Sequence, residues 1–481
     1  MAEKLIFDYS QRGKGGIELI NLNINDVKLE ECIDEELVRD NLNLPEVTEI
    51  DVIRHYTKLS RENFGVDIGF YPLGSCTMKY NPKINEDLAS LEGFLNIHPL
   101  QPDDSIQGIL EILYTFEKYL CSLFGYNKFT FQPVAGAHGE LTGLMLIKAY
   151  HESRNEKSRN IILIPDSSHG TNPASASQVG YVTKTISSTK DGEINIEELE
   201  KNIDKNIAGL MLTNPNTLGL FDRNILKISD LIHKAGGLVY YDGANANATL
   251  GKARPGDLGF DIAHLNLHKT FSTPHGGGGP GAGPIGVKKH LTEFLPQPVI
   301  DKKDNSYKLI FNLEKNIGKV HSFYGNINVI IKAYIYLLGL GSKGLEKVSE
   351  IAVLNANYLK AKLKDYFNIP YDRVCQHEFV ISLKEEKIKY GIKALDVAKR
   401  LIDYGIHPPT VYFPLIVQEC LMIEPTETES KNTLDEFCDA MINIYREIRE
   451  NPDVLKEAPH DTPVKRLDEV KAVKEPKLRW I

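Results

Sequence analysis

Short apolar runs alternate with amphipathic stretches in the middle of this 481-residue chain, and this alternation limits the possible folds more than any other feature. Stretches with apolar residues at helical spacing, such as 195–203 and 225–236, separate the runs. Apolar strands that alternate with helices indicate a mainly parallel sheet with helices on both faces, and therefore an α/β fold. The runs are "NIILIPD" (160–166), "AGLMLTN" (208–214), "GGLVYYDGA" (236–244) and "DIAHLNLHK" (261–269).

The regions on either side of the alternation differ from it. Apolar residues at helical spacing over 105–124, followed by Gly125, predict the helix that opens the large domain. A long helical stretch after Asn328, broken near Gly339–Gly341, precedes two strand-like runs, "EFVISL" and "TVYFPLIV". We therefore expect a coil-rich N-terminal arm over 1–105, a large α/β domain over 106–327 and a smaller α+β domain with an extended tail over 328–481.

Composition excludes several classes of function. The chain is 42% hydrophobic and 25% charged, as folded soluble proteins are, and its formal charge of −9 argues against binding to nucleic acid or to a membrane surface. We find no apolar stretch long enough to span a bilayer and no apolar signal-peptide core, so we expect a cytoplasmic protein. The six cysteines are scattered without metal-ligand spacing, and we predict no metal site.

Lys269 ends the last apolar run and comes just before the glycine-dense segment "GGGGPGAG". A Walker-type phosphate loop needs its glycines before the lysine, and a Rossmann fingerprint needs G-x-G-x-x-G after the first strand. Neither pattern fits this segment. Two interpretations stay open from this segment alone: a surface lysine beside an ordinary turn, or a lysine that bonds covalently to carbonyl groups.

Polar residues at the ends of other strands favour the second interpretation, because ligands of parallel sheets bind beyond the carboxyl ends of the strands. Asp242 can accept a hydrogen bond from a protonated ring nitrogen, and the imidazole of His169 can stack on a planar ring. The segment "AGAHGE" (135–140) opens a helix, whose free N–H groups can bind a phosphate. Each feature alone also suits an ordinary polar loop. Together with Lys269 they make up a pyridoxal 5′-phosphate (PLP) site, with the cofactor covalently bound at this lysine.

Longer motifs carry a resemblance to a known family. "LGSCTMKYNP", "VAGAHGELTGL", "SSHGTNPASA", "DGANANA", "LNLHKTFSTPHGGGGPGAGPIGV" and "IEPTETESK" follow one another between about residue 70 and residue 431. In this order they resemble the glycine decarboxylase P-protein of the glycine cleavage system, in its C-terminal, cofactor-bearing half. The resemblance implies a PLP-dependent transferase of fold type I and the second subunit of a split enzyme.

The resemblance also implies an activity and partners. The activity is the PLP-dependent decarboxylation of glycine, an oxidoreductase reaction in which the aminomethyl group passes to the lipoyl arm of the H-protein and CO₂ is released. The implied partners are glycine, the lipoylated H-protein and a separate subunit 1, in a heterotetramer with two copies of each subunit.

Roles for single residues follow from the same resemblance. It implies that Lys269 binds the cofactor covalently, that Asp242 pairs with the pyridinium nitrogen and that His169 stacks on one face of the ring; these three form the predicted catalytic set. Ala244 is expected to pack against the other face, and the first N–H groups of the helix to bind the phosphate. The predicted cofactor-binding residues are Gly136, Ala137, His169, Thr213, Thr217, Asp242, Ala244, His268 and Lys269.

Two rival functions remain. The first is another PLP reaction, such as decarboxylation of a larger amino acid or desulfuration; a desulfurase needs a mobile cysteine near its site, and none follows Lys269 closely. The second is a catalytically silent subunit that shapes an active partner. The intact set of Lys269, Asp242 and His169 argues against a silent subunit.

Overall fold

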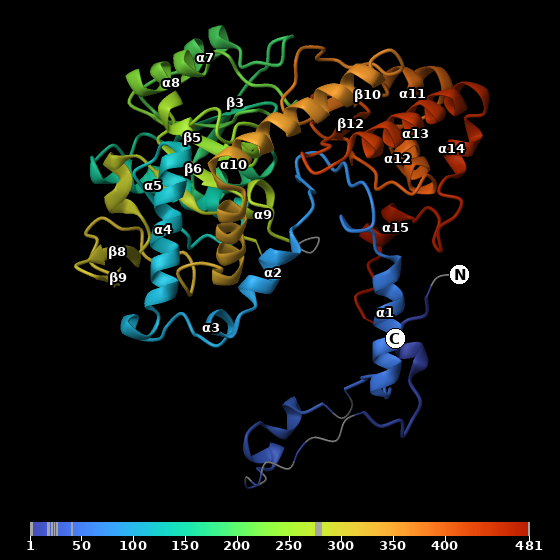
Figure 1. The fold of residues 1–481 in the computed structure, drawn as a ribbon, viewed down its shortest axis with the longest axis horizontal. Coiled ribbons are helices and arrows are strands. Elements are labelled where there is room, and N and C mark those ends of the chain that lie inside the picture. Colours follow the sequence, from blue (N-terminus) through green and yellow to red (C-terminus); the bar gives the residue numbers. More distant parts are fainter. Residues whose placement is uncertain are drawn as a thin grey trace. The chain divides into compact units, whose positions relative to one another are not determined.

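The computed structural model describes residues 3–16, 20, 23, 25, 27–39, 42–274 and 281–479 (Figure 1). They form two compact units, one made of Met1–Ile68 with Glu457–Ile481 and the other of Gly69–Lys456. The boundaries expected at residues 105 and 327 stay predictions. The first unit contains the helices α1 (Glu49–Glu62) and α15 (Glu469–Lys474) and the 3₁₀ turns Ile6–Tyr9, Leu29–Glu31 and Glu35–Leu37. No helix among the described residues has both the length and the apolar character needed to cross a membrane.

A seven-stranded sheet lies at the centre of the second unit, in the order β1-β7-β6-β5-β4-β2-β3. Neighbouring strands from β6 to β3 are parallel, whereas β7 runs antiparallel to both of its neighbours. The mainly parallel sheet and its four predicted strands are therefore confirmed, with β7 as the exception. The strands are β1 (Lys128–Thr130), β2 (Ile161–Pro165), β3 (Val182–Ile186), β4 (Ile207–Thr213), β5 (Leu238–Gly243), β6 (Ile262–Leu265) and β7 (Ile285–Val287).

Helices cover both faces of this sheet, as predicted. On β5, Val239 and Tyr241 belong to one buried apolar cluster, while Leu238 and Tyr240 belong to another. Successive strand residues point to opposite faces, so the two clusters lie on the two sides of the sheet. The first cluster includes residues of α4 (Gln107–Phe124), α7 (Ile196–Asn202) and α8 (Ile225–Lys234), and the second includes residues of α5 (Gly136–Ser153) and α6 (Thr171–Val179).

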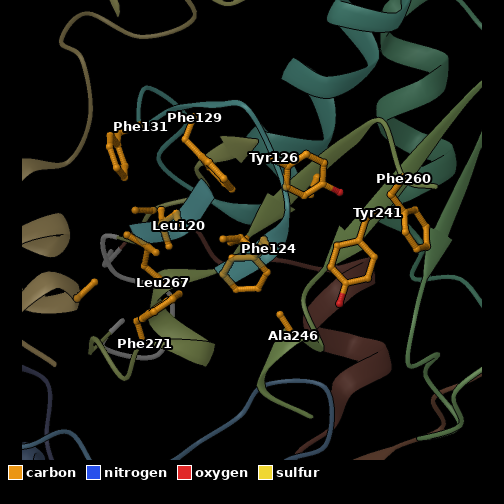
Figure 2. Close-up of a cluster of buried hydrophobic side chains, with 14 of the residues drawn as sticks. Leu120, Phe124, Tyr126, Phe129, Phe131, Tyr241, Ala246, Phe260, Leu267 and Phe271 are labelled. Carbon is orange, nitrogen blue, oxygen red and sulfur yellow. The ribbon is translucent and has the colours of Figure 1, made fainter. Parts of the chain in front are cut away.

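The first cluster also fixes the one-turn helix α9 (Leu267–Thr270) that carries the predicted lysine. Figure 2 shows Phe124 of α4 between the α9 region and Tyr241. The rings of Phe124 and Phe271 make an edge contact, with 6.4 Å between their centroids. Because Leu267 and Phe271 are fully buried here, the backbone on both sides of Lys269 has little freedom to move.

The C-terminal part of the second unit is a smaller α+β layer. The long helix α10 (Ile327–Leu363) leads into it, with the expected break at Gly341, where φ is 61°. An antiparallel sheet follows, in the order β10-β12-β11, made of Phe379–Ser382, Cys420–Ile423 and Thr410–Val411. The strand expected over "TVYFPLIV" is confirmed only at its first two residues, because Tyr412 turns the chain with φ 61° and Pro414 has no N–H to donate.

The remaining elements of the second unit are short, apart from α13. They are α2 (Lys83–Ala89), α3 (Glu92–Leu95), β8 (Val299–Lys303), β9 (Ser306–Ile310), α11 (Lys384–Tyr390), α12 (Ala394–Asp403), α13 (Lys431–Glu450) and α14 (Asp453–Glu457), with 3₁₀ turns at Asp103–Ser105, Ala246–Ala248, Pro255–Leu258 and Lys289–Phe294.

Candidate active site

All nine residues of the predicted cofactor-binding set line one cavity of about 440 Å³. Thr213 and Asp242 lie at the carboxyl ends of β4 and β5, and His169 follows β2. The cavity is therefore at the edge of the sheet where a doubly wound fold binds its ligands, and its volume is typical of a small-molecule site. The structure brings the predicted residues together; the role of each stays a proposal.

Lys269 lies on α9 and not at the end of a strand, because β6 stops at Leu265 and Asn266 begins the helical turn. Its Nζ atom donates a hydrogen bond of 2.7 Å to the backbone oxygen of Ser75. A single turn of helix with fully buried flanking residues thus presents one amine to the cavity.

Asp242 is 2% exposed and receives hydrogen bonds from several sides. Its Oδ1 accepts from the Ala244 N–H at 3.0 Å, and its Oδ2 accepts from Asn172 Nδ2 at 3.1 Å and from Thr213 Oγ1 at 3.3 Å. Burial opposes ionisation, but His264, the Ala244 N–H, the Asn172 amide and the charge of Lys269 outweigh it and lower the pKa of Asp242. The site therefore holds a carboxylate at neutral pH, as a partner for a protonated ring nitrogen must be.

His264 supports this carboxylate from the neighbouring strand, with Nε2 3.3 Å from Asp242 Oδ1. Its Nδ1 lies 2.7 Å from the Tyr240 hydroxyl. Burial raises the pKa of Tyr240 well above its ordinary value, so the hydroxyl stays protonated and donates a hydrogen bond to Nδ1. Burial also lowers the pKa of His264, which leaves a neutral ring that donates its Nε2–H to Asp242.

A second acid, Glu140, lies close to Asp242 on the first turns of α5. Burial and the charge of Asp242 raise the pKa of Glu140 to about 7. Its Oε1 accepts a hydrogen bond of 2.8 Å from Thr171 Oγ1, which in turn lies 2.8 Å from His169 Nδ1. This chain of contacts orients the imidazole of His169, whose pKa burial lowers.

The N-terminus of α5 closes another side of the cavity at Gly136 and Ala137. The first N–H groups of a helix have no partner within it, and they attract anions such as phosphate. A Cβ atom on Gly136 would lie 2.6 Å from Asn266 Oδ1, so a side chain there would intrude on the site. The glycine is thus needed at the place where the phosphate is expected.

The glycine-dense segment is only partly described, since residues 275–280 lie outside the described residues. The glycines that follow residue 280 lie against residues of the cavity. A Cβ on Gly281 would lie 2.7 Å from His268 Nδ1, and one on Gly283 would overlap the backbone oxygen of Ala135. At these two positions only glycine lets the backbone pack this closely against the neighbouring chain.

Sequence reasoning missed about half of the cavity lining. Thr217, which it included, donates to the backbone oxygen of Ser167 and so holds the loop after β2. The lining residues without a predicted role come from an N-terminal segment and from positions between the predicted ones: Ser75, Cys76, Ala135, Glu140, Thr171, Asn245, His264, Asn266 and Gly281. The spacing of Asp242 and His264 on neighbouring strands was a usable signal for His264. The N-terminal segment belongs to the motif "LGSCTMKYNP", which carries the resemblance, but no role was predicted for its residues.

Comparison with known proteins agrees with this geometry. A family model described as glycine dehydrogenase, C-terminal domain, matches residues 348–465, and a model of aminotransferase class-V matches residues 142–300. A probable glycine dehydrogenase (decarboxylating) subunit 2 from Caldanaerobacter subterraneus subsp. tengcongensis is 60% identical over 477 residues, which is 99% of this chain and 98% of that protein. A protein of the same description from Alkaliphilus oremlandii is 56% identical over 478 residues, again 99% and 98%.

Solved structures agree on the fold. The crystal structure of a glycine decarboxylase (P-protein) of the glycine cleavage system, in inhibitor-bound form, superposes with a TM-score of 0.73 at 20% identity. The superposition covers 88% of this chain and 95% of the glycine decarboxylase chain. A NifS-like protein gives a TM-score of 0.60 at 16% identity, with 79% of this chain and 99% of that chain covered.

Proposed function

The chain belongs to the family of glycine dehydrogenase (decarboxylating) subunit 2, and on this premise we propose which of its residues carry out the reaction. It is an oxidoreductase of fold type I, the family's cofactor is PLP, and the family's activity is the decarboxylation of glycine in the glycine cleavage system. The work of the individual residues is our own proposal.

The cavity meets the three requirements of PLP. The cofactor needs an amine for its aldehyde, a carboxylate for its ring nitrogen and an anion site for its phosphate. Lys269, Asp242 and the start of α5 offer these groups around one cavity. This arrangement is the single observation that carries the proposal, because each group alone also has an ordinary structural explanation.

When bound, the cofactor supplies an electron sink for the electron pair that remains after the carboxyl group of glycine leaves as CO₂. Asp242, kept ionised by its donors, holds the ring nitrogen in its protonated form. Lys269 anchors the cofactor, and its amine can move a proton at the reacting carbon after glycine has taken its place. His169 would cover one face of the ring, with Thr171 and Glu140 fixing its imidazole.

The name of the relatives, subunit 2, implies a partner subunit 1. We propose that two copies of each form a heterotetramer and that the lipoylated H-protein accepts the aminomethyl group. In that step a C–S bond forms while the lipoyl S–S bond breaks, CO₂ leaves, and the released sulfur takes up one proton. We also propose a cytoplasmic location, which suits a chain whose six cysteines are all free thiols.

Release of labelled CO₂ from carboxyl-labelled glycine tests the function. The chain co-expressed with a candidate subunit 1 is expected to release CO₂, and to release it faster when lipoylated H-protein is added. Larger amino acids and cysteine serve as control substrates. Release of sulfide from cysteine without any reaction of glycine would overturn the proposal in favour of a desulfurase, and an inactive chain without a visible cofactor band would favour a silent subunit.

A further inference from the structure

The segment Ser75–Thr77, which we call the strap, sets the position of the Lys269 amine. Ser75 and Cys76 line the cofactor cavity, and the backbone oxygen of Ser75 accepts the hydrogen bond from Lys269 Nζ. Just before the strap, Leu73 forms a β-bridge with Ile423 at the end of β12. Any change in the strap therefore reaches the amine through one hydrogen bond.

Two buried carboxyl groups hold the strap from behind. Glu378 Oε2 accepts from the Ser75 N–H at 2.7 Å, and Glu424 accepts from Thr77 twice, from its N–H at 2.9 Å and from its hydroxyl at 2.6 Å. Both glutamates are 0% exposed. Strand register brings them together, because Glu378 comes just before Phe379 of β10, which pairs with Ile423, the residue just before Glu424.

The charges around this pair do not balance two carboxylates. The neighbouring His377 is fully buried, and burial lowers its pKa to about 3, so its ring is neutral. Glu427, the other acid near Glu424, is paired with Lys79 at 2.7 Å, and burial raises the pKa of the Cys76 thiol. The positive charge of Lys269 acts on Glu378 and on Glu424. One cation facing two buried acids calls for one of the acids to keep its proton.

We propose that Glu378 stays protonated while Glu424 is ionised, and that this unequal pair is a positioning device that holds the strap and, through it, the Lys269 amine. The inference rests on the proposed role of Lys269. Both oxygens of Glu424 receive hydrogen atoms from Thr77, as suits a carboxylate. Glu378 accepts one short hydrogen bond, from Ser75 to Oε2, while its Oε1 accepts only a long one of 3.5 Å from Asn245 Nδ2. Neither ring nitrogen of His377 has a hydrogen-bond partner among the described residues, and the neutral ring supplies no charge that would offset an ionised Glu378.

The titration of the two acids agrees with this assignment. Burial and the charge of Glu424 raise the pKa of Glu378 well above its ordinary value. Burial also raises the pKa of Glu424, but the Thr77 hydroxyl and N–H and the charge of Lys269 limit the rise to about 7. As pH rises, Glu424 therefore ionises first, and its charge makes the loss of the second proton harder.

A divalent cation is the alternative occupant of this cluster, since ligand atoms of His377, Glu378 and Glu424 lie within 4.8 Å of one another. The charge of Lys269 acts on all three and repels a cation. Three of the four carboxyl oxygens already accept hydrogen bonds from the strap. The unequal acid pair explains these contacts without an ion.

Three variants, each co-expressed with subunit 1 and loaded with PLP, test the proposal. Glu378→Gln mimics a protonated acid, and we expect glycine decarboxylation within about threefold of the unmodified enzyme and an unchanged pH midpoint of the visible cofactor band. Glu424→Gln removes the negative charge, and we expect a roughly tenfold loss of activity and a midpoint about one pH unit lower, because the positive charge at Lys269 loses its counter-ion. Glu429→Gln is the matched control, since this half-buried acid of the same loop has no hydrogen bond to the strap among the described residues; it is expected to change neither.

Three results would each overturn the proposal. The first is a loss of activity above about 100-fold in Glu378→Gln, and the second is an unchanged pH midpoint of the cofactor band in Glu424→Gln. The third is one equivalent of bound metal in the unmodified enzyme that is absent from Glu424→Gln. If Glu378→Gln fails to fold, infrared spectroscopy of the unmodified enzyme decides. At about pH 9 a protonated carboxyl band that shifts on ¹³C-glutamate labelling is expected, and its absence contradicts a protonated Glu378. Failure of the proposed function itself would be seen separately, as a visible band that survives Lys269→Ala.

Discussion

Two pairs of buried acids lie near Lys269, one on the sheet wall of the cavity and one behind the strap that forms another wall, and the protonation of the two pairs differs. On the sheet wall, His264 of β6, the Ala244 N–H and the Asn172 amide lower the pKa of Asp242, and its neighbour Glu140 is the acid with the raised pKa. On the strap wall, the pKa values of both Glu378 and Glu424 are raised. On the sheet wall, hydrogen-bond donors fixed by the fold stabilise the charge of Asp242 together with Lys269. The strap, by contrast, is held in place by hydrogen bonds to Glu378 and Glu424, so its position and the protonation of these acids depend on each other.

Lys269→Ala removes the group that the two walls share and is expected to have the largest effect. Without the amine, the visible band of the lysine-bound cofactor should vanish, and decarboxylation should fall by at least about 10⁴-fold, because a covalent anchor and a proton carrier are lost together. Absorbance spectra and CO₂ release measure both. Borohydride reduction followed by peptide mapping is the check: a label on another lysine would contradict the assignment.

Lys79→Met tests how much the buried ion pair of Lys79 and Glu427, next to the strap, contributes to the stability of the protein. Lys79 follows the strap by two residues; its buried Nζ donates to Glu427, to Asn247 and to the backbone oxygen of Thr270, next to Lys269. Removing the ammonium group leaves Glu427 buried without its counter-ion, which should lower the free energy of unfolding by about 3–5 kcal/mol. Chemical denaturation measures it.

The double variant Lys79→Met, Glu427→Leu is the control for this prediction. It removes both charges and should regain much of the lost stability. A single variant that loses less than about 1 kcal/mol would show that the strap side does not depend on this ion pair.

Asp242→Asn tests the sheet wall. The amide keeps the shape of the side chain but cannot carry the charge that holds the ring nitrogen protonated, so we expect decarboxylation to fall by about 100-fold or more, or about 3 kcal/mol in activation free energy, while the cofactor stays bound. Steady-state kinetics and the cofactor-to-protein ratio separate the two effects. Near-normal turnover would contradict the role of Asp242 as partner of the ring nitrogen.

The same contrast explains what the sequence could predict. Lys269, Asp242 and His169 follow buried strands, so a local pattern of apolar runs was enough to bring them to one edge of the sheet. The strap and its acids are 303 and 347 residues apart in the sequence, and no local pattern links them. Their meeting depends on the register of β10 against β12, which only the folded chain reveals.

Two strands of the central sheet were also missed, for reasons of burial and length. β3 is an edge strand with mostly exposed or half-exposed residues, so it lacks the continuous apolar run that marked its neighbours. β7 has only three residues and follows the glycine-dense segment. The lysine was expected at a strand end and lies on a helical turn, because the apolar Leu267 extended the run beyond the strand.

Glu140→Gln is expected to have the smallest effect. It tests, through the pH dependence of the unfolding free energy, whether one acid of the sheet wall is kept neutral. The pKa of Glu140 is about 7 in the folded protein and near 4.5 in the unfolded chain, so the folded state binds the extra proton between these values. The stability that this proton contributes is complete below about pH 4.5 and is lost as pH rises through about 7. Glutamine cannot ionise, so the variant should show a flatter fall of unfolding free energy between about pH 5 and about pH 8, measured by denaturation at several pH values. Glu429→Gln, which removes another half-buried acid whose pKa burial raises, serves as the control. An unchanged slope in Glu140→Gln would mean that Asp242 does not push its neighbour toward the neutral form, and the sheet wall would then hold two charges where the strap wall holds one.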